Sequence, residues 1–140
     1  GTERVRDYAK YFDCEFVICD KTREKANEVK SVEVIGEVKD KDVIIVDDLI
    51  DTGGTIAMAS NVIMDKGAKS VRAIITHPVL SGNAEENLEN SSLIELVVTD
   101  SIPLNIRNKK IKVLSIAGLF AKAIRKIHEN ESTSSLFINR

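Results

Sequence analysis

The sequence has 140 residues, of which 43% are hydrophobic and 30% are charged. This length supports one hydrophobic core, so we expect one globular domain over residues 1–140 and not a disordered chain. The formal net charge of −2 argues against a nucleic-acid-binding surface. No apolar run approaches the roughly 20 residues of a membrane span, so neither nucleic acid nor membrane is an expected partner.

The two cysteines, Cys14 and Cys19, stand five positions apart in apolar surroundings. This spacing and these surroundings argue against a disulfide framework, so we expect buried free thiols and a reducing, cytoplasmic compartment. A zinc site would have to add His77 and His128, and these spacings fit no common pattern. The sequence therefore predicts no metal site of its own.

The hydrophobic pattern predicts helices alternating with strands. In chain order, we expect a helix over 2–13, strands over 15–19 and 32–35, a strand over 43–46, a helix over 55–66 that ends at Gly67, a strand over 71–76, a short helix over 84–90, strands over 94–98 and 111–114, and a final helix over 116–127 with Ser115 as its N-cap. The charged stretch 20–29 has little apolar content, which predicts an exposed loop.

Four β-branched residues, Val43 to Val46, follow one another without a polar break. A strand that is apolar on both faces is typical of the middle of a parallel sheet covered by helices on each side. Together with the alternation of strands and helices, this predicts an α/β fold with a mostly parallel sheet and right-handed crossovers.

The stretch that follows this strand carries most of the chemistry. It contains the acids Asp47, Asp48 and Asp51, the hydroxyls of Thr52 and Thr55, and the pair Gly53-Gly54. In an open α/β sheet, ligands bind at the carboxyl ends of the strands. Backbone amides near a glycine pair at a helix start can bind phosphate, and the carboxylates can accept hydrogen bonds from sugar hydroxyls. A plain tight turn is the alternative, but this many polar groups in one place favour a site for a phosphorylated sugar. It is not a nucleotide P-loop, because Thr55 and not Lys follows the second glycine.

The segment IVDDLIDTGGT, Ile45 to Thr55, resembles the phosphoribosyl pyrophosphate (PRPP) motif of type I phosphoribosyltransferases. Further segments resemble the PRPP synthetase (ribose-phosphate pyrophosphokinase) family, and the similarity runs from Gly1 to about Phe137. These segments are Lys21-Thr22-Arg23 with Lys25-Ala26-Asn27, Thr76-His77-Pro78 with Leu80-Ser81-Gly82, Thr99-Asp100-Ser101-Ile102-Pro103, and Glu131 to Phe137.

The resemblance implies a type I phosphoribosyltransferase-like fold and an enzyme that transfers the pyrophosphoryl group of ATP to O1 of ribose 5-phosphate, with Mg²⁺, giving PRPP and AMP. It implies that Asp51, Thr52, Gly53, Gly54 and Thr55 cradle the 5-phosphate and that Asp47 and Asp48 bind the ribose hydroxyls. Lys21 and Arg23 match a flexible catalytic loop whose cations would neutralise the transferring group. Ser132, Ser134 and Phe137 match a regulatory site at a subunit interface.

The family's chain is about twice as long, and this sequence resembles its second half. The chain opens at Gly1 without Met and enters a helical pattern at once, so we expect a piece of a longer protein. The Mg²⁺ ligands and most of the ATP pocket belong to the family's first half, so we expect this chain alone to be inactive. Family members form dimers that assemble into hexamers, which makes a homo-oligomer the expected state. Two alternatives stay open: a phosphoribosyltransferase that uses PRPP, and a non-catalytic regulatory module associated with PRPP synthetase.

Overall fold

A parallel four-stranded sheet forms the centre of the molecule. The computed structural model describes the backbone of residues 2–25 and 28–137 and the side chains of residues 5–20 and 31–137. The strands are β3 (Asp42–Ile50), β4 (Ser70–Pro78), β5 (Leu93–Thr99) and β6 (Ile111–Leu114), in the spatial order β3-β4-β5-β6. All three neighbouring pairs are parallel, so the four strands end at one edge of the sheet. The predicted α/β fold with a parallel sheet is confirmed.

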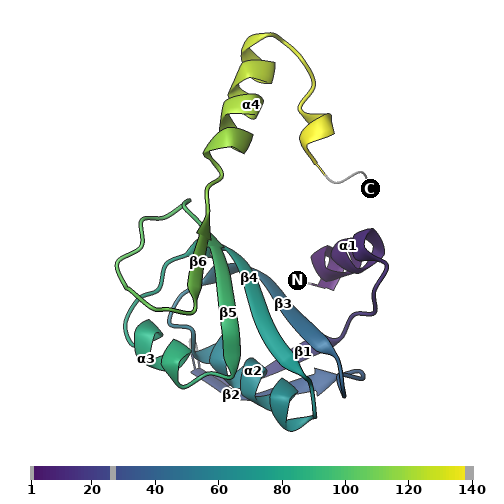
Figure 1. Ribbon diagram of the computed structural model, residues 1–140, viewed down its shortest axis with the longest axis vertical. Coiled ribbons are helices and arrows are strands. Elements are labelled where there is room, and N and C mark those ends of the chain that lie inside the picture. The colour runs from purple at the N-terminus through teal and green to yellow at the C-terminus, as the bar shows by residue number, and fades with distance from the viewer. Residues whose placement is uncertain (1, 26–27, 138–140) are drawn as a thin grey trace.

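Helix α2 (Gly54–Asp65) packs against one face of this sheet, and the short α3 (Ala84–Glu89) packs beside it. Figure 1 shows α2 behind the strands. The alternation along β4 explains the packing: Val71, Ala73 and Ile75 are at most 1% exposed and face the helices, where Ile63 of α2 is fully buried. Gly67 adopts a positive φ of 91° just beyond α2, as a helix stop requires.

The opposite face of the sheet is apolar and exposed. Ile44, Ile74 and Ile94 are 55%, 44% and 51% exposed, and no helix within the described part of the chain covers them. Strand β3 is the edge strand of the described sheet, so the prediction that residues 43–46 lie in its middle is wrong. The apolar run correctly indicates a strand with two apolar faces. It does not indicate whether a neighbouring strand pairs with each of its two edges.

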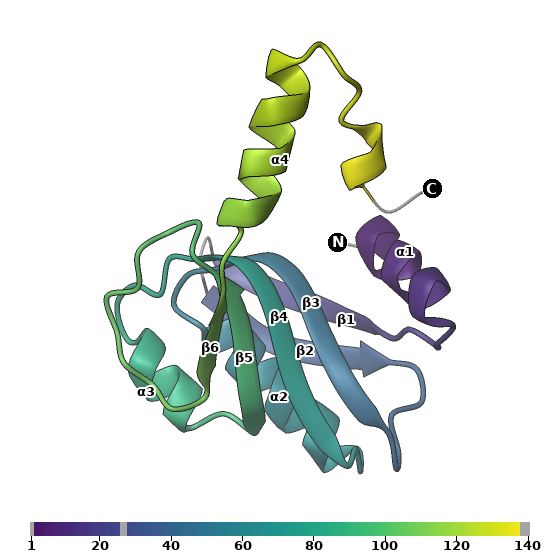
Figure 2. The ribbon, with the colours of Figure 1, turned by 45° about the horizontal axis from the view of Figure 1, so that its top comes forward.

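The charged stretch after residue 19 forms a hairpin and not the predicted loop. Strands β1 (Ile18–Lys25) and β2 (Glu28–Ile35) pair antiparallel, with Lys21 opposite Val32 and Arg23 opposite Val29. The prediction missed this because β1 itself is polar, whereas its partner β2 places Val32 and Val34 in the core at 7% and 2% exposure. The hairpin lies on the same side of the sheet as α2 (Figure 2).

The terminal elements extend from this body. Helix α1 (Thr2–Phe12) precedes the hairpin, and α4 (Ala117–His128) leaves the sheet edge where β6 ends and projects outward, followed by the 3-10 turn η1 (Ser134–Leu136) (Figures 1 and 2). The predicted N-cap, Ser115, is wrong by one residue, because Ile116 holds that position. None of the described helices has the length and hydrophobicity needed to cross a bilayer.

Both cysteines are free thiols, but their surroundings differ from the prediction. Cys14 is exposed in the link between α1 and β1, so the prediction that it is buried is wrong, and Cys19 is half-buried in β1. The apolar neighbours of Cys14 in the sequence belong to the same link, where Phe16 is itself 41% exposed.

Candidate phosphate-binding site

Asp47 and Asp48 belong to strand β3 and not to a loop. Strand β3 continues through Ile50, four residues beyond the predicted end, with Asp47 opposite Ile75 in the register. Because successive strand residues point to opposite faces, the Asp47 and Asp48 carboxylates lie on opposite faces of β3. Asp47 is half-buried beside α2, and Asp48 is exposed. The structure therefore separates two carboxylates that the resemblance assigns to the same sugar.

The chain turns from β3 into α2 through Asp51, Thr52 and Gly53. Gly53 is the N-cap of α2 with a φ of 73°, in the left-handed region that suits glycine, and it is buried. Gly54 is the first residue of α2, one position before the predicted start. The turn thus places the glycine pair at the carboxyl edge of the sheet, as the sequence predicted.

Three successive carbonyl groups of this turn are held by the segment that follows β4. The Ile50 carbonyl accepts from the Val79 and Leu80 N–H groups at 3.0 and 3.2 Å. The Asp51 carbonyl accepts from the Ser81 N–H at 3.2 Å, and the Thr52 carbonyl accepts from the Asn87 side-chain amide at 2.7 Å. The Ser81 hydroxyl also donates to the Asp51 carboxylate.

This arrangement orients the amides. No peptide bond in the described chain is cis, and in a trans peptide the N–H points away from the preceding carbonyl. The N–H groups of Asp51, Thr52 and Gly53 are therefore directed away from the segment 79–87. Among the described residues, none accepts a hydrogen bond from the N–H of Thr52, Gly53 or Gly54, or from the Thr52 and Thr55 hydroxyls.

The first turn of α2, all of which is described, carries no acidic side chain. The positive end of the helix dipole is therefore not neutralised from within the helix. Unpaired N–H groups, free hydroxyls and a helix start in one turn are the chemistry that binds a phosphate group. The structure brings together Thr52, Gly53, Gly54 and Thr55, with the Asp51 carboxylate tied to Ser81 beside them.

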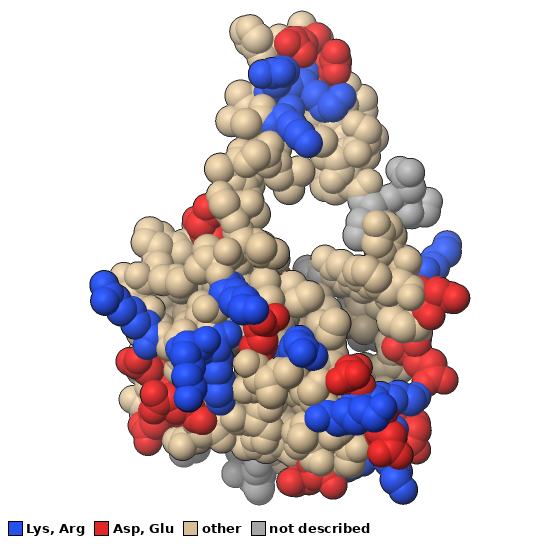
Figure 3. Space-filling model, in the orientation of Figure 1, with Lys and Arg blue, Asp and Glu red and all other residues tan. Residues whose placement is uncertain are grey.

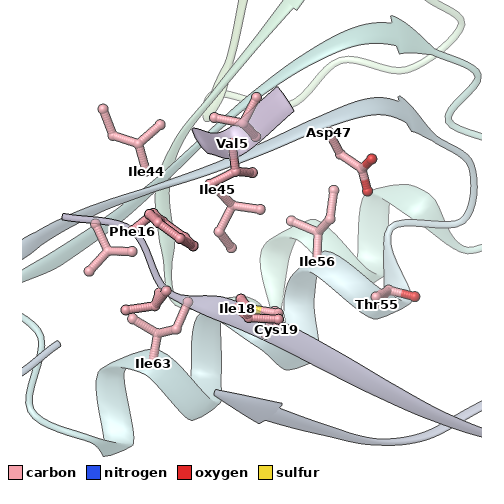
Figure 4. Close-up of a pocket in the computed structure, with 14 residues that line it drawn as sticks. Val5, Phe16, Ile18, Cys19, Ile44, Ile45, Asp47, Thr55, Ile56 and Ile63 are labelled. Atoms are coloured by element: carbon pink, nitrogen blue, oxygen red, sulfur yellow. The ribbon is translucent and has the colours of Figure 1, made fainter. Parts of the chain in front are cut away.

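A cavity of about 330 Å³ lies next to this turn, between β1, β3, α2 and α1. Asp47 and Thr55 form its polar end, while Phe16, Ile45 and Ile63 belong to its apolar remainder (Figure 4). Of the predicted site residues whose side chains are described, only Asp47 and Thr55 line it. The cavity extends from the turn into the apolar interior, so the turn and not the cavity offers the donors that an anion needs.

Other polar groups gather at the same edge of the sheet. The His77 Nδ1 atom lies 2.9 Å from the Ser101 hydroxyl, which donates to the Thr76 carbonyl at 3.1 Å. The Asp100 carboxylate accepts from the Ile116 N–H at 2.8 Å, and hydrogen bonds from the Ser115 hydroxyl and from this N–H lower the pKa of Asp100. In the described part of the chain, no three His, Cys, Asp or Glu residues group closely enough to hold a metal ion.

The remaining predicted residues come from two other parts of the chain, β1 and the C-terminal segment. The side chains of Lys21 and Arg23 are outside the described residues, and only their backbone is placed, in β1. Ser132 and Ser134 contact each other, with their hydroxyls 2.9 Å apart, and Phe137 is 72% exposed. The sequence analysis missed Asn87, for which no motif gave a signal, and it used Ser81 only as part of a segment that resembles the family.

Comparisons with known proteins agree on one family. The family described as the phosphoribosyl synthetase-associated domain matches residues 16–138. The ribose-phosphate pyrophosphokinase of Campylobacter jejuni is 54% identical over 138 residues, which are 99% of this chain and 45% of that protein. The enzyme of the same name from Helicobacter hepaticus is 53% identical over 98% of this chain and 44% of its own length.

A solved structure gives the same result. The phosphoribosylpyrophosphate synthetase of Mycobacterium smegmatis superposes with a TM-score of 0.78 and 41% identity, covering 91% of this chain and 42% of that chain. The chain thus spans a little under half the length of the relatives it matches. The resemblance found in the sequence is confirmed, and the chain belongs to the phosphoribosyl synthetase-associated domain family.

Proposed function

We propose that this chain is the ribose 5-phosphate-binding half of a ribose-phosphate pyrophosphokinase, which transfers the pyrophosphoryl group of ATP to O1 of ribose 5-phosphate and gives PRPP and AMP. The unpaired N–H groups of Thr52, Gly53 and Gly54 at the end of β3 are the main support. A sugar phosphate dianion supplies the acceptors that these donors lack.

We assign a role to each residue from the chemistry of its side chain or backbone. Thr52 to Thr55 hold the 5-phosphate, and Asp47, at the polar end of the cavity, accepts from ribose hydroxyls. Asp48 contributes to binding of the ribose from the opposite face of β3. Lys21 and Arg23 neutralise charge on the transferring group, because phosphoryl transfer depends mainly on positioning and electrostatic stabilisation.

Magnesium is part of the proposal, with ligands that this chain supplies only in part. Mg²⁺ prefers octahedral oxygen ligands, and no group of three acidic or other metal-ligating side chains occurs among the described residues. Asp47 and Asp48 are single carboxylates on opposite faces of one strand. As the family resemblance implies, we propose that the ion's protein ligands come mainly from residues outside this chain, together with the ATP site.

The surface supports assembly with further protein. The accessible surface is 9722 Å², whereas a compact monomer of 15.5 kDa exposes about 7,200 Å². The excess of about 2,500 Å² is of the order that one partner contributes to a large permanent interface. Exposed Leu119, Phe120 and Ile124 lie on one side of α4, and an opening separates α4 from α1 in the space-filling view (Figure 3). We therefore include a homo-oligomer, dimer to hexamer, in the proposal. We also propose a cytoplasmic setting, because Cys14 and Cys19 are free thiols.

The C-terminal segment enters the proposal as a regulatory element. Ser132 and Ser134 present two hydroxyls in one turn, and the exposed Phe137 ring follows them. Hydroxyl donors beside an exposed ring suit a phosphate or an ADP molecule at a contact between subunits.

Calorimetric titration of the chain with ribose 5-phosphate, ribose and inorganic phosphate tests the binding half of the proposal. We expect saturable binding of ribose 5-phosphate, weaker binding of phosphate, and none of ribose at the same concentrations. A coupled assay for AMP release should find no turnover by the chain alone. Binding of ribose as strong as that of ribose 5-phosphate contradicts a phosphate cradle.

Two further assays separate the alternatives. Release of pyrophosphate from PRPP in the presence of a purine or pyrimidine base would identify a phosphoribosyltransferase. In a longer protein that contains this chain and makes PRPP, Lys21→Ala should abolish turnover and leave ribose 5-phosphate binding intact. A non-catalytic regulatory module would be indifferent to that substitution.

A further inference from the structure

One of the three carbonyl groups that the segment 79–87 holds is bound by a side chain. The Ile50 and Asp51 carbonyls accept from backbone N–H groups, which no substitution except proline removes. The Thr52 carbonyl accepts from Asn87 Nδ2 at 2.7 Å. The orientation of the Thr52–Gly53 peptide therefore depends on the identity of residue 87.

This peptide needs such a restraint more than its neighbours do. A peptide flips when ψ of the first residue and φ of the second change together, and glycine at the second position makes the flip inexpensive, because it adopts either sign of φ. Gly53 holds a φ of 73° in the structure. After a flip, the Thr52 carbonyl would replace the Gly53 N–H on the side of the turn where a phosphate would bind, and would repel it.

The helix that carries Asn87 is itself firmly held. Ala84 and Leu88 of α3 are fully buried. The Lys110 ammonium donates to the Leu88 and Ser91 carbonyls at 2.6 and 2.8 Å, which satisfies the carboxyl end of α3. Asn61 of α2 accepts from the Ser92 N–H at 2.8 Å just beyond it. Asn87 therefore projects from a rigid base toward the turn.

We infer that Asn87 is a positioning residue for the phosphate cradle: by holding the Thr52 carbonyl, it keeps the Gly53 N–H directed at the anion. The inference rests on the proposed function, because it takes the 5-phosphate of a sugar phosphate as the anion. Asn87 acts through the Thr52–Gly53 peptide and need not contact the ligand.

The experiment compares Asn87→Leu with Asn90→Leu, since both asparagines lie at the same end of α3 but Asn90 is exposed and its side chain makes no hydrogen bond in the described structure. Affinities for ribose 5-phosphate and inorganic phosphate are measured by calorimetry on protein shown to be folded by circular dichroism. We expect Asn87→Leu to bind both ligands roughly three- to tenfold more weakly, which is the effect of one hydrogen bond, and Asn90→Leu to bind them like the wild type.

The Gly53 amide gives a readout that a purely structural role would not change. In the unliganded wild type we expect one sharp Gly53 amide NMR signal, and in Asn87→Leu a broadened or doubled signal from the flipping peptide. If Asn87→Leu does not fold, Asn87→Asp replaces it, because a carboxylate cannot donate to a carbonyl, and Asn90→Asp controls for the added charge.

The outcomes separate the two claims. If the wild type binds both ligands and the Asn87 variants bind them equally tightly, the positioning role is overturned and the proposed function stands. Absence of ribose 5-phosphate and phosphate binding in the wild type overturns the proposed function and this inference together. Weaker binding in the Asn87 variants alone, with an altered Gly53 signal, supports both.

Discussion

Gly53 shows how a single residue joins the fold to the site. Its positive φ lets the chain leave β3 and begin α2 within three residues, and the same conformation presents its N–H at the start of the helix. A Cβ at this position would meet Ile50, Ala84 and Asn87 at 3.7 to 3.8 Å, which is ordinary van der Waals contact. The requirement for glycine therefore comes from the backbone conformation and not from lack of space.

Gly53→Ala should lower the free energy of unfolding by about 1 kcal/mol, the cost of placing an alanine in the left-handed region. It should also weaken ribose 5-phosphate binding, because the relaxed turn moves the amides. Urea denaturation and calorimetry measure the two effects. Gly118→Ala is the matched control: it lies in α4, a Cβ there has nothing within 4 Å, and the substitution should not destabilise the protein. Equal stability of Gly53→Ala and the wild type would show that the turn does not need its left-handed residue.

At the scale of elements, the strongly periodic segments were predictable and the polar ones were not. The helices α2 and α4 and the strands β4 and β5 begin and end within two residues of their predicted limits, because their apolar spacing reports which face is buried. The strand predicted over 15–19 overlaps β1 only at Ile18 and Cys19, and the rest of β1 was interpreted as a loop because its sequence is polar. The end of β3 was missed because Asp47 and Asp48 look like turn residues, while their backbone pairs with β4 as a regular strand.

The candidate site was also predictable only in part. The residues of the turn, Asp51 to Thr55, could be identified because a glycine pair next to threonines at a predicted helix start indicates exposed backbone amides. The segment that orients them, Val79 to Asn87, follows a different strand, and only the parallel pairing of β3 with β4 places it there. A sequence read one segment at a time contains no signal for that contact.

Helix α4 is attached to the sheet through a charged anchor, which predicts a pH dependence. Hydrogen bonds from the Ser115 hydroxyl and the Ile116 N–H lower the pKa of Asp100 in the folded protein below its ordinary value of 3.8. A lowered carboxyl pKa stabilises the folded state above pH 3.8, and this stabilisation is lost as the pH falls through the folded-state pKa.

Hydrogen exchange of the Ile116 amide should therefore accelerate in acid beyond the trend of other α4 amides. Asp100→Ala should show fast exchange of this amide already at neutral pH. Asp65→Ala, which removes an exposed acid at the end of α2, serves as the control. Identical Ile116 exchange in the wild type and in Asp100→Ala would mean that the anchor does not hold the helix.

The whole molecule exposes two apolar surfaces that its own described elements do not cover. One is the face of the sheet opposite α2, with Ile44, Ile74 and Ile94, and the other is the α4 stripe of Leu119, Phe120, Ile124 and Ile127. Contiguous exposed apolar residues on a folded chain mark sites of contact with other protein. They agree with a chain that spans less than half the length of its relatives.

The isolated chain should therefore associate with itself as its concentration rises, measured by analytical ultracentrifugation over the micromolar range. Phe120→Lys should shift the distribution toward the monomer, because it places a charge in the α4 stripe. Ala121→Lys adds the same charge at the next exposed position, outside the stripe, and should change association little. A chain that stays monomeric at all concentrations, with or without Phe120, would show that α4 does not mediate assembly.

The free amides at the end of β3 are proposed to hold the phosphate of ribose 5-phosphate. Titration of ¹⁵N-labelled chain with ribose 5-phosphate, followed by amide NMR, measures this contact residue by residue. We predict that the Thr52, Gly53 and Gly54 signals move furthest, downfield and saturably, and that inorganic phosphate moves the same three. Saturable binding that leaves these three signals unmoved while shifting others would exclude these amides as the phosphate site.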